Sequence, residues 1–204
     1  MRDLQGDSSE AAGAISCVEV TPGRWADLER LFGAAGACGG CWCMYWRLGA
    51  KDWGAGKGDG NRLALEALVN AGPPPGLLAY EGATPVGWCA VAPRAAFPRL
   101  DRSKNLAPVD DLPVWSLACF FIARRHRRQG VSEQLIRGAV AMARSHGAIA
   151  LEAYPVVPQE AEMPDAFAWT GILSSFQKLG FQEVARRSVN RPIVRLRLDP
   201  PVVM

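Results

Sequence analysis

Residues Ile122 to Ser132 read IARRHRRQGVS, a basic loop that joins a predicted strand to a predicted helix. The strand, Pro113 to Ile122, is almost continuously apolar, which is typical of a central strand covered on both faces. The helix is predicted to start near Gly130, where apolar residues begin to recur at helical spacing. The glycine lets the backbone turn with its N–H groups facing outward, and the first helical turn adds unpaired donors and partial positive charge. The loop is therefore predicted to bind a phosphate or pyrophosphate.

The loop differs from two common phosphate-binding motifs. It contains neither the P-loop pattern Gly-x-x-x-x-Gly-Lys-Ser/Thr nor the dinucleotide pattern Gly-x-Gly-x-x-Gly. Arg127, Gly130 and Ser132 instead follow the order Arg-x-x-Gly-x-small. This order resembles the acyl-CoA signature of the GNAT superfamily of N-acetyltransferases, in which Gly or Ala usually stands where this chain has serine. A second stretch, FQKLGF at Phe176 to Phe181, resembles the family's Tyr-x-Lys-x-Gly-Phe, with Phe176 in place of the tyrosine.

The order of the predicted elements is also similar to that family along nearly the whole chain after residue 13. The resemblance implies an α/β (α+β), GNAT-like fold whose mixed central sheet of six to seven strands is splayed between two parallel strands and flanked by about four helices. A short helix is possible at 41–48, and Asn61 is predicted to cap the second helix. Strands are predicted at 15–20, 76–81, 86–92, 113–122, 148–154, 181–187 and 192–198, and helices at 21–32, 61–72, 130–147 and 168–179.

The composition is that of an ordinary globular protein, with 49% hydrophobic residues, 21% charged residues and a net charge of +3. This mild charge predicts no nucleic-acid partner, and no apolar run approaches the roughly 20 residues that span a membrane. Residues 1–13 lack the apolar core of a signal peptide and are predicted to be a disordered tail before one domain at 14–204. The six cysteines are expected to be free thiols in a cytoplasmic monomer or homodimer.

The resemblance implies that acetyl-CoA binds where the two central parallel strands part. The backbone of Phe120, Phe121 and Ile122 would pair with the pantetheine arm like an added strand, and one of these N–H groups would polarise the thioester carbonyl. Backbone N–H groups of the loop would hold the pyrophosphate, and an arginine side chain would reach the 3′-phosphate. The loop residues in these roles are Arg127, Arg128, Gln129, Gly130, Val131 and Ser132. The alternative is that the basic loop is only a solvated surface.

Acetyl transfer to an amine requires a group that accepts a proton, directly or through water. Glu152 is the predicted base, because it lies mid-strand among apolar neighbours beside the expected cleft, where burial would raise its pKa. The alternative is that Glu152 is ion-paired or faces solvent. The family's tyrosine protonates the leaving thiolate, and Phe176 cannot. Ser175, or its neighbour Ser174, is therefore the predicted substitute, unless the thiolate leaves without an acid.

Cys38, Cys41 and Cys43 form a second cluster, CGGCWC. Cys-x-x-Cys is a metal-ligand spacing, but no second pair follows closely, so we expect no metal and interpret these residues as small, partly buried thiols. In the layout of the resembled family this segment overhangs the acceptor site. Aromatic residues predicted to line the acceptor pocket are Trp42, Trp46, Trp53 and Tyr154, and the alternative is that they belong to the core.

These features together predict a small-molecule enzyme. We expect an N-acetyltransferase that moves the acetyl group of acetyl-CoA directly to a primary amine, with no covalent enzyme intermediate. A pocket poor in carboxylates argues against a polycationic acceptor. The alternative is a non-enzymatic sensor or interaction domain that keeps the CoA-binding scaffold, and the missing tyrosine is the reason to consider it.

Overall fold

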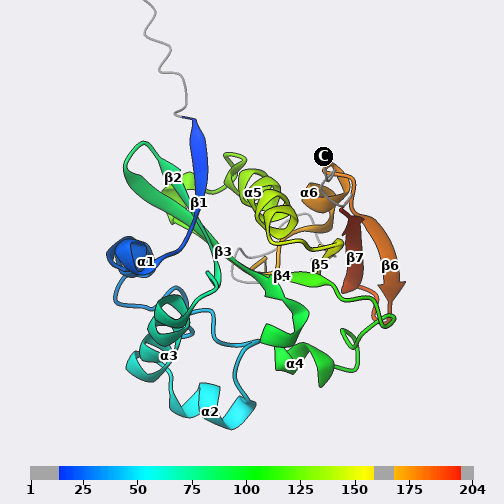
Figure 1. Ribbon diagram of the computed structural model, residues 1–204, viewed down its shortest axis with the longest axis horizontal. Coiled ribbons are helices and arrows are strands. Elements are labelled where there is room, and N and C mark those ends of the chain that lie inside the picture. Colours follow the sequence, from blue (N-terminus) through cyan, green and yellow to red (C-terminus); the bar gives the residue numbers. More distant parts are fainter. Residues whose placement is uncertain (1–13, 159–167, 199–204) are drawn as a thin grey trace, which may run out of the picture.

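The computed structural model describes residues 14–158 and 168–198, so the predicted tail at 1–13 lies outside the described residues. Its centre is a seven-stranded sheet in the order β1-β2-β3-β4-β5-β7-β6, in which only β4 and β5 are parallel (Figure 1). This confirms the predicted mixed sheet. The strands are β1 (Ile15–Glu19), β2 (Gly76–Glu81), β3 (Thr84–Pro93), β4 (Trp115–Ile122), β5 (Ala150–Ala153), β6 (Gln182–Arg186) and β7 (Pro192–Arg197).

Helices cover both faces of the sheet. One core includes buried residues of α1, α3 and the segment 42–46, and the other is formed under α5 and α6. Helix α5 packs closely because the sheet presents Gly87, where an added Cβ would lie 2.9 Å from Val131 Cγ1. The helices are α1 (Trp25–Phe32), α2 (Ala50–Ala55), α3 (Asp59–Ala71), α4 (Pro98–Asp101), α5 (Val131–Ser145) and α6 (Leu173–Gln177).

The two parallel strands part halfway along β4. Pairing with β5 is limited to Trp115–Leu151, Ser116–Glu152 and Leu117–Ala153. Ala118 is unmatched in the pairing of β4 with β3, which marks a β-bulge at the point where β5 is lost. From there to Ile122, β4 pairs only with β3, and its other edge faces away from β3. The predicted splay is therefore present, and it starts after Leu117.

Three local predictions were wrong for identifiable reasons. Asn61 does not cap α3, which begins at Asp59; its side chain is buried and donates to the carbonyls of Gly40 and Trp53. The helix predicted at 168–179 is confined to Leu173–Gln177, because Gly171 has φ +83° and Ile172 forms a parallel bridge with Val156. The helix considered at 41–48 is a series of turns instead.

Candidate active site

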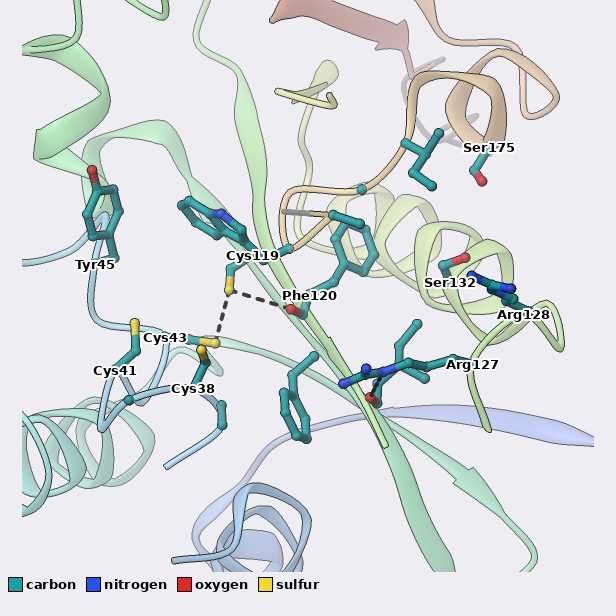
Figure 2. Close-up of a pocket in the computed structure, with 18 of the residues that line it drawn as sticks. Cys38, Cys41, Cys43, Tyr45, Cys119, Phe120, Arg127, Arg128, Ser132 and Ser175 are labelled. Atoms are coloured by element: carbon teal, nitrogen blue, oxygen red, sulfur yellow. Dashed lines mark hydrogen bonds between the residues drawn. The ribbon is translucent and has the colours of Figure 1, made fainter. Parts of the chain in front are cut away.

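A cavity of about 1040 Å³ lies between the loop after β4 and the glycine-rich segment before α2. Figure 2 shows Arg127, Arg128 and Ser132 on one side of it and Tyr45 with the cysteines on the other. The side chains between these ends come from the free edge of β4 and from residues that precede or begin α6. The lining includes Cys38, Cys41, Cys43, Tyr45, Trp53, Lys57, Cys119, Phe120, Phe121, Ile122, Arg127, Arg128, Gly130, Ser132, Glu133, Trp169 and Ser175.

The loop at the first end has the backbone geometry of an anion-binding turn. Gly130 adopts a left-handed conformation (φ +79°), and Arg128 does the same (φ +60°) despite its side chain. Among the described residues, no backbone or side-chain group accepts a hydrogen bond from the N–H groups of residues 128–132. The Gly130 carbonyl accepts from Glu133 N and Gln134 N, at 3.0 and 3.2 Å, and so fixes the first turn of α5. Successive unpaired amides at a helix start form a concave site for phosphate oxygens.

The free edge of β4 lies beside this loop. Alternation along the strand sends the N–H of Ala123 to Val86 O (2.9 Å), so the N–H groups of Phe120 and Ile122 point to the opposite edge. The Phe120 N–H already donates to Trp169 O at 2.7 Å. The Ile122 carbonyl accepts from Arg127 Nε at 3.1 Å. Of the two N–H groups on this edge, that of Ile122 has no hydrogen-bond acceptor among the described groups.

Four cysteines line the other end of the cavity, including Cys119, which sequence reasoning did not assign to the site although it directly precedes Phe120. Cys43 Sγ and Cys119 Sγ are 3.0 Å apart (Figure 2). The hydrogen bond with Cys43 and burial raise the pKa of Cys119 well above its usual value, and burial raises that of Cys41. Within the ranges that the structure describes, no three His, Cys, Asp or Glu side chains are placed to hold a metal ion.

The predicted acceptor residues separate into different environments. Trp53 lines the cavity, whereas Trp46 lines a smaller adjoining cavity. Trp42 packs in the core against Phe32, with ring centroids 5.4 Å apart, which fits the core alternative. Tyr154 is fully buried and its hydroxyl is 2.7 Å from Ser116 Oγ, away from the cavity lining.

Of the two predicted catalytic residues, Ser175 lines the cavity and Glu152 does not. Glu152 is 1% exposed, and its carboxylate accepts from Arg195 Nη2 at 2.6 Å and from Arg94 Nη1 at 3.5 Å. These are the surroundings described by the ion-pair alternative. The neighbour of Ser175, Phe176, is fully buried against Phe181 and does not reach the cavity.

The turn after β4 thus presents unpaired amides beside the gap between two parallel strands. Residues 42–163 match the model of the acetyltransferase (GNAT) family, which is more than half of the chain. The chain therefore belongs to this family and is an acetyl-CoA-dependent acyltransferase. No protein of curated function matches the sequence.

Solved structures share the fold at low sequence identity. The histone acetyltransferase HPA2 and related acetyltransferase from Corynebacterium glutamicum matches with a TM-score of 0.53 and 16% identity, over 93% of this chain and 99% of that one. An N-acetyltransferase from Staphylococcus aureus Mu50 gives 0.52 and 11%, over 91% and 99%. The acetyltransferase yncA from Salmonella typhimurium, solved with acetyl-CoA, gives 0.51 and 16%, over 91% and 95%. In the part of the chain that is described, no helix is long and apolar enough to cross a membrane.

Proposed function

We propose that this enzyme transfers the acetyl group of acetyl-CoA directly to a primary amine of a small molecule. The observation that carries the proposal is the cavity of about 1040 Å³ that reaches from the unpaired amides of the loop to an aromatic wall. A cavity of this size accommodates a nucleotide-linked arm at one end and leaves a space bordered by aromatic side chains at the other. Amine and thioester are thereby held next to each other in one cavity.

The loop supplies the contacts for the cosubstrate. The N–H groups of residues 128–132 have no partner among the described groups, so they fit a pyrophosphate that accepts several hydrogen bonds at once. The arm would lie along the free edge of β4, where the Ile122 N–H has no acceptor among the described groups. When bound, acetyl-CoA supplies the acetyl group as a thioester, which an uncharged amine can attack.

Direct transfer agrees with the state of the cavity thiols. A cysteine must be a thiolate to attack a thioester, and raised pKa values keep Cys41 and Cys119 protonated at neutral pH. This disfavours attack by Cys41 or Cys119 on the thioester. In the proposed reaction the amine is the nucleophile, and its proton passes to water, directly or through a relay.

Release of free CoA thiol in the presence of a panel of primary amines tests the function. At substoichiometric enzyme, several turnovers with at least one small amine are expected, and mass spectrometry should find one added acetyl group on the nitrogen. Tight binding of acetyl-CoA with no turnover of any small amine would overturn the proposal.

Ser175→Ala is expected to lower kcat about 3- to 10-fold with the KM for acetyl-CoA unchanged. The hydroxyl lines the cavity and is proposed to donate to the leaving thiolate. General acids contribute about 100-fold or more to harder leaving groups, and a thiolate needs less help. Ser174→Ala is the matched control, because Ser174 is the exposed neighbour. Equal effects of both substitutions would remove Ser175 from this role.

Glu152→Gln is expected to leave the shape of the pH profile of kcat/KM unchanged, because its carboxylate contacts Arg195, Arg94 and Tyr154 instead of the cavity. Stopped assays across the pH range from about 5 to 9 measure this, since that range spans the pKa values useful to a general base. If Glu152 takes the proton, as its position in the strand predicts, the acid limb of the profile disappears in the variant.

A further inference from the structure

Four aromatic side chains form a continuous wall at the acceptor end. The Tyr45 ring lies 4.8 Å from Trp46, 5.3 Å from Trp53 and 5.4 Å from Trp169, measured between centroids. Beyond this wall is a second cavity of about 200 Å³, which shares Tyr45 and Trp169 with the first. The two cavities therefore adjoin at Tyr45 and Trp169. The second cavity is completed by Trp46, Ser103, Asn105, Leu106 and Arg191.

Arg191 is the charged residue of this second cavity. Its Nη1 donates to Thr170 Oγ1 at 2.8 Å, and Thr170 is itself fully buried, so the guanidinium is held in place. Within residues 14–158 and 168–198, no carboxylate pairs with Arg191. A guanidinium has five N–H donors, and the bond to Thr170 uses one of them. Several oriented donors and a full positive charge thus remain for a ligand.

Two more cations border the wall without a described carboxylate partner. Lys57 Nζ lies 4.6 Å from the centroid of the Trp53 ring, and Arg99 Cζ lies 3.8 Å from that of Tyr45. Among the residues that the structure describes, the acidic one that lines the first cavity is Glu133, which belongs to the α5 end and pairs with Lys178 at 3.0 Å. The described charged side chains at the acceptor end are therefore positive. They repel a polycation and attract an anionic group.

The second cavity also contains an unused donor. Trp46 is 7% exposed and lines it, and the indole N–H of Trp46 has no hydrogen-bond partner among the described groups. A buried N–H without a partner costs stability, so it is usually satisfied by water or by a ligand. Asn105 and Ser103 add polar side chains on the same lining. Arginine with nearby neutral donors is the arrangement that binds a carboxylate.

We propose that the acceptor is an amine that carries a carboxylate, an amino acid or a close relative, and that Arg191 binds this carboxylate in the second cavity. The inference rests on the proposed function, because it assigns the acceptor of that reaction. The amine would lie in the first cavity, the body of the molecule against Tyr45 and Trp169, and the carboxylate against Arg191. Apolar or aromatic amino acids fit this wall best.

The test compares α- and ω-amino acids with their carboxamides and decarboxylated amines as acceptors, with free CoA thiol as the readout. Wild-type kcat/KM is expected to favour the best acid over its amide by about 10- to 100-fold, which is about 1.4 to 2.8 kcal/mol. Arg191→Gln should lower kcat/KM for the acid by a similar factor and change that for the amide less than about twofold. Arg191→Lys keeps the positive charge but cannot make the paired hydrogen bonds of a guanidinium, so its kcat/KM for the acid should lie between those of the wild type and Arg191→Gln.

Arg144→Gln is the control, because Arg144 is an exposed arginine on α5 away from both cavities. Calorimetry with acetyl-CoA shows whether each variant keeps a folded cosubstrate site. Turnover of amines with no preference for the acid, or an equal loss for acid and amide in Arg191→Gln, overturns the inference and leaves the proposed function standing.

If no acceptor is turned over, the proposed function is overturned. The carboxylate site at Arg191 is then tested separately, by measuring how tightly the acids and amides bind. The acids and amides are titrated into CoA-loaded protein, with tryptophan fluorescence as the readout. Tighter binding of the acids that is lost in Arg191→Gln supports the carboxylate site. Equal binding of acids and amides overturns it.

Discussion

Gly130→Asp is expected to weaken the binding of acetyl-CoA at least about 100-fold, a loss of about 2.7 kcal/mol. The substitution places a carboxylate beside amides that are proposed to hold a doubly charged pyrophosphate. Two unit charges about 4 Å apart near a protein surface repel by about 4 kcal/mol, so the expected loss is about two-thirds of the Coulomb term for one such pair. Isothermal titration calorimetry at low and at high salt measures it, and salt should relieve part of the loss.

Gly147→Asp separates this charge effect from backbone strain. Gly147 follows α5, has φ +76° compared with +79° at Gly130, and a Cβ would meet no atom within 4 Å at either position. Both variants should lose stability of similar size, because a left-handed residue with a side chain costs about 1–2 kcal/mol. Only the variant at Gly130 should lose acetyl-CoA. Unchanged affinity in that variant would place the pyrophosphate elsewhere.

Arg195→Met is expected to lower the free energy of unfolding by about 3–5 kcal/mol, because it leaves the buried carboxylate of Glu152 without its main partner. Arg195 donates to Glu152 Oε1 through Nη2 at 2.6 Å and through Nε at 3.0 Å. It also holds Asp110 with two bonds, at 2.8 and 3.0 Å. The remaining contacts of Glu152, with Arg94 and Tyr154, are longer, at 3.5 and 3.3 Å. Guanidinium-induced unfolding measures the loss.

The double variant Arg195→Met with Glu152→Met should recover most of the lost stability, since it buries no unpaired charge. Arg197→Met, an exposed arginine at the end of the same strand, is the single-site control. The hydrogen bond from Arg195 lowers the pKa of Asp110 below its usual 3.8. This contribution is therefore present above about pH 4 and is lost as the pH falls below that value. A destabilisation of Arg195→Met no larger than that of the control would contradict the account.

Local chemistry explains the parts of the fold that the sequence alone predicted well. The strand predicted at 76–81 is β2 without change, because turn-forming residues bound an apolar run on both sides. Helix α5 begins one residue after Gly130 and ends before Gly147, and the left-handed conformation of Gly147 is the usual one for a glycine just after a helix. The parting of β4 and β5 followed from the resemblance of two short motifs to a known family, and not from periodicity.

Side-chain environments depended on contacts that no local pattern encodes. Glu152 looked like an isolated acid in an apolar strand, and its partner Arg195 lies 43 residues later in the chain. Arg191, which precedes the last strand, carried no motif that linked it to Trp46 and Asn105. Similarly, nothing in the apolar sequence of β4 indicated that the Phe120 N–H donates a hydrogen bond to the Trp169 carbonyl. Such pairings are fixed by the tertiary fold.

The sheet is held together across its middle by only three residue pairs between β4 and β5. The two halves of the sheet are thus joined by a short stretch of strand pairing. Backbone amides of β4 beyond this stretch are expected to exchange with deuterium sooner than those inside β2 and β3. A pantetheine arm lying along the free edge of β4 would accept hydrogen bonds from these amides and slow their exchange, most clearly at Ile122. The protein therefore carries a built-in reporter of cosubstrate occupancy, readable by mass spectrometry before any acceptor has been identified.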